Sequence, residues 1–198
     1  MKDLTKGSPS KVMISFAVPV ALGNIFQLCY SLADTRVVGS TLGEAALAAV
    51  GATTSISTLF IGFLSGLTNG FALLIARQFG AGDKRGVTRY GAGCLLLGGI
   101  TALLLTAACV GSLPFILKLL NVPDALMDQS TAYIRAVLLG LLATMLYNGC
   151  ASILRAVGDT TAPLLFLLFA AVLNVALDLL FILKFGFGVA GAAWATVL

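Results

Sequence analysis

The sequence predicts an all-α integral membrane protein, a bundle of six transmembrane helices of which the last is incomplete. Hydrophobic residues make up 59% of the 198 residues, charged residues only 10%, and the mean hydropathy is +1.05. Soluble domains carry about 25% charged residues. Apolar stretches long enough to cross a bilayer recur along the chain, separated by short segments with Gly, Pro, Asp and basic residues. We therefore expect nearly the whole chain to lie in the lipid bilayer.

The predicted spans cover residues 12–38, 45–79, 90–113, 132–154, 163–183 and 188–198. The polar residues 1–11 are expected to precede the first span in solvent. A signal peptide is the alternative for the N-terminus, because residues 31–33 resemble a cleavage site. However, the apolar region is too long and contains Asn24 and Gln27. Pro19 lacks a backbone N–H, so it should kink or weaken the first span.

The basic residues predict the orientation of these spans. Those on the side of the N-terminus are Lys2, Lys6, Lys11, Arg77, Lys84, Arg85, Arg89 and Arg155, against Arg36, Lys118, Arg135 and Lys184 on the other side. Because cytoplasmic loops are enriched in Lys and Arg, the N-terminus is expected in the cytoplasm. This topology also explains the net charge of +4. No aromatic-plus-basic pattern indicates a nucleic-acid partner.

The composition argues against an enzyme or a structural metal centre. The sequence has no histidine, the commonest general base and metal ligand. It has four cysteines, each within an apolar span and at no metal-like spacing, so we expect them to be packing residues: Cys29, Cys94, Cys109 and Cys150. Neither a cofactor nor a nucleophile–base pattern is indicated.

Two carboxylates lie within predicted spans, Asp34 and Asp178. An ionised Asp inside a spanning helix costs roughly 2.5–3.5 kcal/mol. Asn174 lies four residues before Asp178 and is the other polar residue of the fifth span, so both share one helix face. The predicted orientation places Asp34, Asp178 and Thr196 at similar depths, roughly 7–12 Å below the outer surface. We expect Asp178 to handle an ion, a proton or a polar substrate; a buried Asp satisfied by a neighbouring helix is the alternative.

Polar residues follow one narrow arc of the first span at spacings of 3, 4 and 3: Asn24, Gln27, Ser31 and Asp34. This arc is expected to line a watery cavity, although amides and hydroxyls can also join helices by hydrogen bonds. In the fourth span, Thr144, Tyr147 and Asn148 share a face with Gly140. Tyr147 is either a cavity wall or an ordinary interior tyrosine.

The second span has a polar side made of Thr54, Ser57, Thr58, Ser65 and Thr68. Beside it, Gly62, Gly66 and Gly70 form a ridge with four-residue spacing. Small residues at this spacing allow helices to approach closely. We therefore predict that this ridge packs against another helix.

Several segments resemble the multidrug and toxic compound extrusion (MATE) transporter family, in the family's order. They are LTKGS (4–8), the P…GN…ADT…VG pattern (19–39), LAAVGA (47–52), ARQFGAGD (76–83), ILRAVGDTTAP (153–163), LNVALDLLFI (173–182) and GVAGAAWAT (188–196). The resemblance covers nearly the whole chain. It implies two six-helix lobes related by a pseudo-twofold axis, of which this chain would be the N-terminal lobe (residues 1–198).

The resemblance implies a function: antiport of drugs or small organic cations against Na⁺ or H⁺, across the plasma membrane, as in a bacterial inner membrane. The cation site of the first lobe would then comprise Asp34, Asn174, Asp178 and Thr196, whose oxygens suit Na⁺. The two carboxylates, if close, would titrate as a pair. Pro19 matches the family's kink proline. The weaker candidates for the substrate cavity are Asn24, Gln27, Tyr147 and Asn148.

The sequence departs from the family pattern in two ways. Arg36 stands two residues after Asp34, and it would oppose cation binding if it reached the carboxylate. The second lobe is also absent from these 198 residues, although alternating access needs two bundles that rock against each other. The alternatives are a lipid-linked saccharide flippase of the same superfamily and a membrane scaffold without transport activity.

Overall fold

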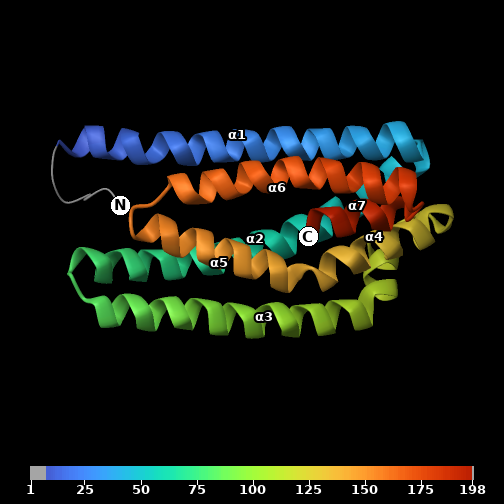
Figure 1. The fold of residues 1–198 in the computed structure, drawn as a ribbon. Coiled ribbons are helices and arrows are strands. Elements are labelled where there is room, and N and C mark those ends of the chain that lie inside the picture. Colours follow the sequence, from blue (N-terminus) through green and yellow to red (C-terminus); the bar gives the residue numbers. More distant parts are fainter. Residues whose placement is uncertain (1–7, 198) are drawn as a thin grey trace.

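The structure is a computed structural model that describes residues 8–197, and every regular element within them is a helix (Figure 1). Residues 1–7 of the predicted polar lead, and Leu198 at the end of the sixth predicted span, lie outside the described part. The elements are α1 (Pro9–Leu42), α2 (Glu44–Gly80), α3 (Lys84–Leu119), η1 (Asp124–Leu126), α4 (Met127–Leu139), α5 (Leu141–Ala156), α6 (Thr161–Leu179), η2 (Leu180–Lys184) and α7 (Gly188–Val197).

Four helices are long and apolar enough to cross a membrane: α1, α2, α3 and α6 continued by η2. A fifth candidate is formed by α4 and α5, which are bent by 43° relative to each other. α7 is shorter, with ten residues. These elements follow the order of the six predicted spans and confirm the all-α membrane class. The long helices run along one common direction (Figure 1).

The third span is longer than predicted. α3 continues through Pro114 to Leu119, whereas the sequence predicted an end at Leu113 and a connection over residues 114–130. The residues after Pro114 are mostly apolar, and Leu117 is fully buried, so packing outweighs the one backbone hydrogen bond that proline removes. The connection is correspondingly short, because α4 already begins at Met127.

The predicted fourth span is two helices that meet at Gly140. α7 packs against α4 and brings the side chain of Val197 to Gly140, where a Cβ atom would overlap it. Since only glycine leaves that space, the packing of α7 on α4 depends on this residue. The sequence placed Gly140 on the face of Tyr147 but did not predict this bend.

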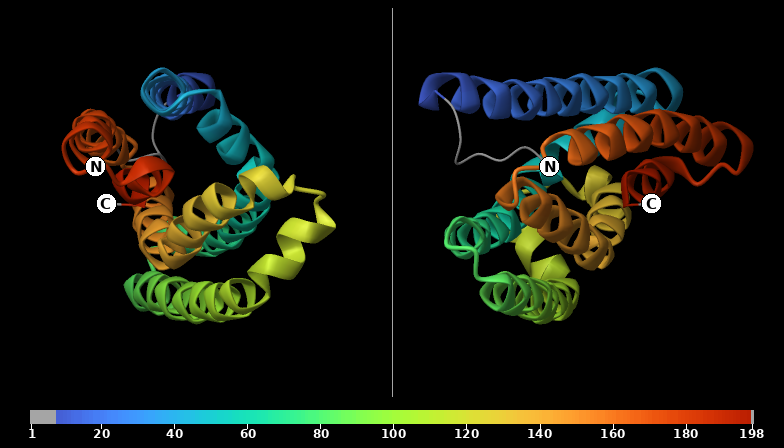
Figure 2. Two further views of the ribbon diagram at one scale, coloured as in Figure 1. Left: turned by 90° about the vertical axis from the view of Figure 1, so that its right-hand side faces the viewer. Right: turned by 60° about the vertical axis from the view of Figure 1, so that its left-hand side comes forward.

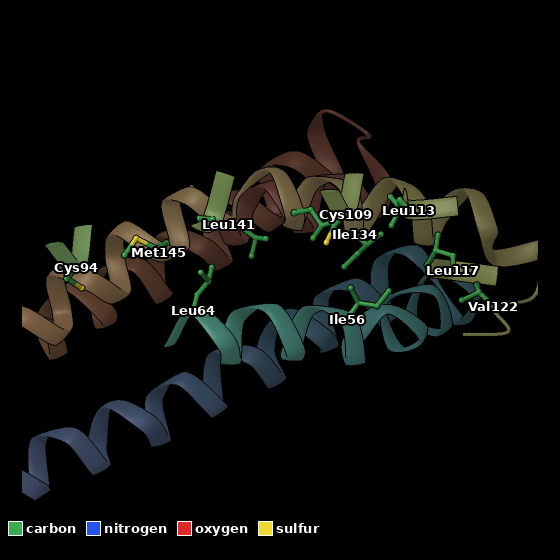
Figure 3. Packing of buried hydrophobic residues seen from close by; sticks show 12 residues of the cluster. Ile56, Leu64, Cys94, Cys109, Leu113, Leu117, Val122, Ile134, Leu141 and Met145 are labelled. Carbon is green, nitrogen blue, oxygen red and sulfur yellow. The ribbon is translucent and has the colours of Figure 1, made fainter. Parts of the chain in front are cut away.

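The larger hydrophobic core lies between α2, α3, α4 and α5 (Figure 3). Ile56 and Leu64 contribute from α2, and Ile134 from α4. α3 and α5 pack closely where Met145, which is fully buried, lies against Gly98. Cys94 and Cys109 are buried packing residues as predicted, whereas Cys29 and Cys150 are exposed; all four are free thiols.

The glycine ridge of α2 does not pack as predicted. Nothing lies within 4 Å of a Cβ atom placed at Gly62, Gly66 or Gly70, so no described helix covers this face. The reason is the direction of the apolar residues: Leu64 and Ile75 are fully buried on the other side of α2, towards α3 and α5. The residues on the polar side of α2 also differ in their burial. Among its members Thr68 is buried, Ser57 and Ser65 are half-buried, and Thr54 and Thr58 are exposed.

A second, smaller set of contacts joins α1, α6 and α7 to the core. α1 lies alongside α6, as Figure 1 and the right-hand view of Figure 2 show. At Gly23, the missing side chain leaves room for Leu164 and Leu167 of α6. Towards the far end of α1, a buried apolar cluster joins α1, α2, η2 and α7: Val38, Ala46, Ile182, Val189 and Ala192. This cluster fixes the end of α1 that carries Asp34.

Candidate functional site

α1 and α6 run parallel (Figure 1), and each carries one of the two carboxylates in its last turns. Asp34 lies two turns before the end of α1, and Asp178 lies at the end of α6. The two carboxyl groups are direct neighbours, and each acts electrostatically on the other. The similar depth expected from the sequence therefore corresponds to direct contact between the two side chains.

The oxygens of this pair lack donors. Asp178 is 0% exposed, and neither of its oxygens has a hydrogen-bond partner among the described residues. The same holds for the buried Oδ1 atom of Asp34, which is half-buried as a residue. Buried acceptors without donors are rare in proteins, and they indicate an ion, a proton or water as the natural partner. The arrangement therefore suits a cation.

Asn174 and Thr196 complete the cluster. Asn174 lies one turn before Asp178 on α6, is buried, and donates from Nδ2 to Oγ1 of Thr196 on α7 over 3.4 Å. Thr196 is exposed and donates in turn to the carbonyl of Ala192 at 3.0 Å. These two bonds leave the Oδ1 atom of Asn174 without a donor. The four residues predicted from the sequence thus come together from three helices.

The oxygen set fits a small hard cation. It consists of two carboxylates, one amide oxygen and one hydroxyl, all ligands that Na⁺ or a bound proton can use. No group of three or more His, Cys, Asp or Glu side chains occurs in residues 8–197, so the cluster does not resemble a transition-metal site.

Two tyrosines lie within electrostatic range of the carboxylates, and neither was predicted from the sequence. Tyr30 precedes Asp34 by one turn of α1, and Tyr133 belongs to α4. Tyr30 could have been found from its four-residue spacing to Asp34. Tyr133 could not, because its proximity depends on how α4 packs against α7 and α2.

Arg36 does not disturb the site. Two residues along a helix correspond to about 200° of rotation, which directs Arg36 away from Asp34. Its side chain is exposed, and it is not among the groups that act on Asp34. The interference that the sequence suggested is therefore absent.

The candidate cavity residues lie on two helix faces. On α1, Asn24 and Gln27 are exposed, as is Ser31. On α5, Tyr147 is 41% exposed. Asn148 differs from these residues, because its Nδ2 donates to Oγ of Ser65 on α2 over 3.5 Å.

A second polar contact follows one turn later along the same two helices. Ser152 of α5 donates to the Oδ1 atom of Asn69 on α2 over 3.4 Å, and Arg155 donates to Oγ of Ser152 over 3.2 Å. Together with the bond from Asn148, these contacts join α5 to α2 by hydrogen bonds. Asn148 therefore holds helices together, as amides in membrane spans commonly do.

The MatE family model matches residues 19–180. The chain belongs to the MATE family of transporters. It is 34% identical to the probable multidrug resistance protein YpnP of Bacillus subtilis, over 99% of this chain and 44% of that protein. The probable multidrug resistance protein NorM of Thermotoga maritima is 29% identical, over 95% of this chain and 41% of the relative.

Solved structures agree with this membership. The crystal structure of MATE in complex with MaD3S superimposes with a TM-score of 0.90 at 32% identity, over 98% of this chain and 44% of that one. A MOP superfamily transporter from Pyrococcus furiosus gives 0.91 at 32% identity, over 98% and 43%. The chain is thus a multi-pass MATE membrane protein and not an enzyme, and it spans about half the length of these relatives.

Proposed function

We propose that this chain is the N-terminal half of a transporter that exports drugs and organic cations in exchange for Na⁺ or H⁺. The observation that carries the proposal is the contact between Asp34 and Asp178, whose buried oxygens have no donor among the described residues. The relatives named as multidrug resistance proteins support the class of substrate.

The carboxylate pair can couple cation uptake to movement of α1. Two ionised carboxylates in contact repel each other, and burial makes that repulsion stronger than in water. A proton shared by Asp34 and Asp178, or a Na⁺ ion held by both with the oxygens of Asn174 and Thr196, relieves it. Cation uptake therefore favours close packing of α1 on α6, and cation release favours their separation.

The polar faces of α1 and α5 are proposed to form the substrate wall, with Gln27, Asn24 and Tyr147 facing the cavity. The aromatic ring of Tyr147 suits an organic cation, since cations are attracted to aromatic faces. Asn148 contributes through its bond to Ser65 rather than through an open side chain. A second lobe, absent from these residues, would close this cavity and provide the partner for alternating access.

The proposed location is the plasma membrane, as in a bacterial inner membrane, with the N-terminus in the cytoplasm. Most of the basic residues lie at one end of the bundle, where α1 begins and where α2 joins α3 and α5 joins α6 (Figure 1). Lys84, Arg85, Arg89 and Arg155 belong to this end. The excess of basic residues favours its placement on the cytoplasmic side.

The proposal is tested by ethidium efflux from vesicles that contain the protein expressed from its full reading frame. Na⁺ and H⁺ gradients are imposed separately, and efflux is expected to follow one of them and to stop when that gradient is collapsed. An efflux rate that stays the same with and without either gradient would contradict the coupling of export to Na⁺ or H⁺. Absence of drug efflux, with the protein folded, would favour the flippase or the scaffold, and transport of a labelled lipid-linked saccharide would then distinguish these two.

Pro19 is proposed as a hinge of α1. The sequence predicted a kink or a weakened turn at Pro19. In the structure α1 is continuous through Pro19, and the helix shows no sharp bend in Figure 1. MATE structures similar to this chain have been solved in a bent and in a straight conformation, which supports a change of conformation in these relatives. Because proline removes one backbone hydrogen bond, it lowers the cost of bending at this point.

Replacing Pro19 with Ala is expected to reduce coupled efflux several-fold while cation binding is retained, because the straight helix becomes more stable. Pro114→Ala is the matched control, since Pro114 also lies inside a long helix but far from the carboxylates. Efflux rates of the two variants and the shift of thermal stability with added cation provide the comparison. Normal coupled efflux in Pro19→Ala would remove the hinge from the mechanism.

A further inference from the structure

The first turns of α3 carry a cluster of cations beside a surface pocket of about 450 Å³. The pocket is lined by Lys84, Arg85, Thr88, Arg89 and Ala92. All five lining residues belong to α3, so the pocket is an open depression along one face of this helix. It lies outside the carboxylate site, which is formed by α1, α6 and α7.

The three cations have no anionic partner in the described part of the chain, residues 8–197. Lys84, Arg85 and Arg89 are exposed and form no ion pair there. The nearby carboxylate of Asp83 lies against Gly86, about 100° around the helix from Arg85. The first turn of α3 also contains no acidic residue. Asp83, the N-cap residue of α3, places one carboxylate at the positive end of the helix dipole against three cations, and a bound anion would balance the remaining positive charge.

The arginines continue directly into an exposed apolar stripe. Arg85, Arg89 and Ala92 are spaced by four and three residues, and the same arc of α3 carries Leu96, Ile100 and Leu103. These three side chains are 65%, 46% and 55% exposed. Ala92, between the arginines and the leucines, leaves space next to the pocket.

The dimensions of this stripe match one lipid leaflet. From Ala92 to Leu103 the helix rises roughly 16 Å. The hydrocarbon core of a bilayer is about 30 Å thick, so one leaflet occupies about 15 Å. A phosphate held by the arginines would therefore lie at the level of the lipid headgroups, with an acyl chain along Leu96, Ile100 and Leu103.

We propose that this face of α3 binds an anionic phospholipid of the phosphatidylglycerol type. Arg85 and Arg89 hold the phosphate, Lys84 and Thr88 contact the headgroup, and the stripe from Ala92 to Leu103 binds an acyl chain. Charge complementarity selects the anionic lipid, because arginine binds phosphate oxygens with directed N–H donors. The topology rule explains basic residues near a membrane surface, but it does not require them to share a helix face with exposed leucines.

The test measures lipid binding to the protein expressed from its full reading frame and purified in detergent, by native mass spectrometry. The probes are dioleoylphosphatidylglycerol, dioleoylphosphatidylcholine and glycerol 1-phosphate. The variant Arg85→Gln/Arg89→Gln is compared with Lys11→Gln/Arg77→Gln, which removes the same charge from exposed positions at the same end of the bundle. One basic residue near a membrane surface contributes about fivefold in affinity, so loss of two residues that both hold the phosphate should cost about 25-fold.

The expected result is tighter binding of phosphatidylglycerol than of phosphatidylcholine, with a loss of affinity of about 25-fold in Arg85→Gln/Arg89→Gln and a clearly smaller loss in the control. The variant Ala92→Trp fills the pocket and keeps all charges, and it should also weaken the binding of phosphatidylglycerol. Equal losses in both double variants would overturn the site in favour of diffuse attraction. Equal binding of the two lipids, or binding of glycerol 1-phosphate as tight as that of the lipid, would overturn the assignment as well.

Discussion

Replacing Asp178 with Asn is expected to reduce cation-coupled efflux at least about tenfold while the protein remains folded. Asp178 is fully buried, and both of its oxygens lack donors among the described residues. An ionised ligand contributes about 1.5–3 kcal/mol, which corresponds to at least about a tenfold change in cation affinity. The amide has the same shape but cannot take up a proton or a negative charge. Efflux rates in vesicles, under the gradient that drives the wild-type protein, measure the loss.

Two comparisons make this result specific. Asp128→Asn is the matched control, because Asp128 is an exposed carboxylate on α4 outside the cluster, and its efflux should stay normal. Asp34→Asn should resemble Asp178→Asn, and the double variant should be little worse than either one, since two groups that act as a unit are not additive. Normal coupled efflux in Asp178→Asn would exclude the carboxylate pair as the cation site.

The contact between these carboxylates could be predicted from the sequence only in part. Asp34 and Asp178 are recognisable because a charge in an apolar span is costly, and their similar depth follows from the count of basic residues. That α1 and α6 are neighbours depends on packing of segments far apart in the chain, such as Leu164 on Gly23. Tyr133 joins the site for the same reason, and no local spacing indicates it.

The glycines show a similar limit. Four-residue spacing predicted close packing at Gly62, Gly66 and Gly70, yet these residues face open space in the described chain. The close helix contacts occur at Gly98 and Gly140, neither of which has another glycine four residues away. Glycine spacing indicates where a helix could approach, but the partner is chosen by the direction of the large apolar side chains. On α2 those side chains point to the opposite face.

Replacing Gly98 with Leu is expected to destabilise the protein by about 1–3 kcal/mol, the usual effect of overpacking a core. A Cβ atom at Gly98 would already overlap the side chain of Met145, which is fully buried and cannot move into solvent. Gly111→Leu is the matched control on the same helix, because nothing lies within 4 Å of a Cβ atom there. Thermal unfolding in detergent should show a lower midpoint for Gly98→Leu and little change for Gly111→Leu.

A second substitution determines whether the contact with Met145 is the cause. Met145→Ala alone should also destabilise, since it leaves a cavity in the core. Combined with Gly98→Leu, it should recover part of the loss, because the leucine occupies the volume that the methionine leaves. Such coupling is expected only for residues in contact. Strictly additive losses would show that Gly98 is required for another reason, and the packing of α3 on α5 would then need a different explanation.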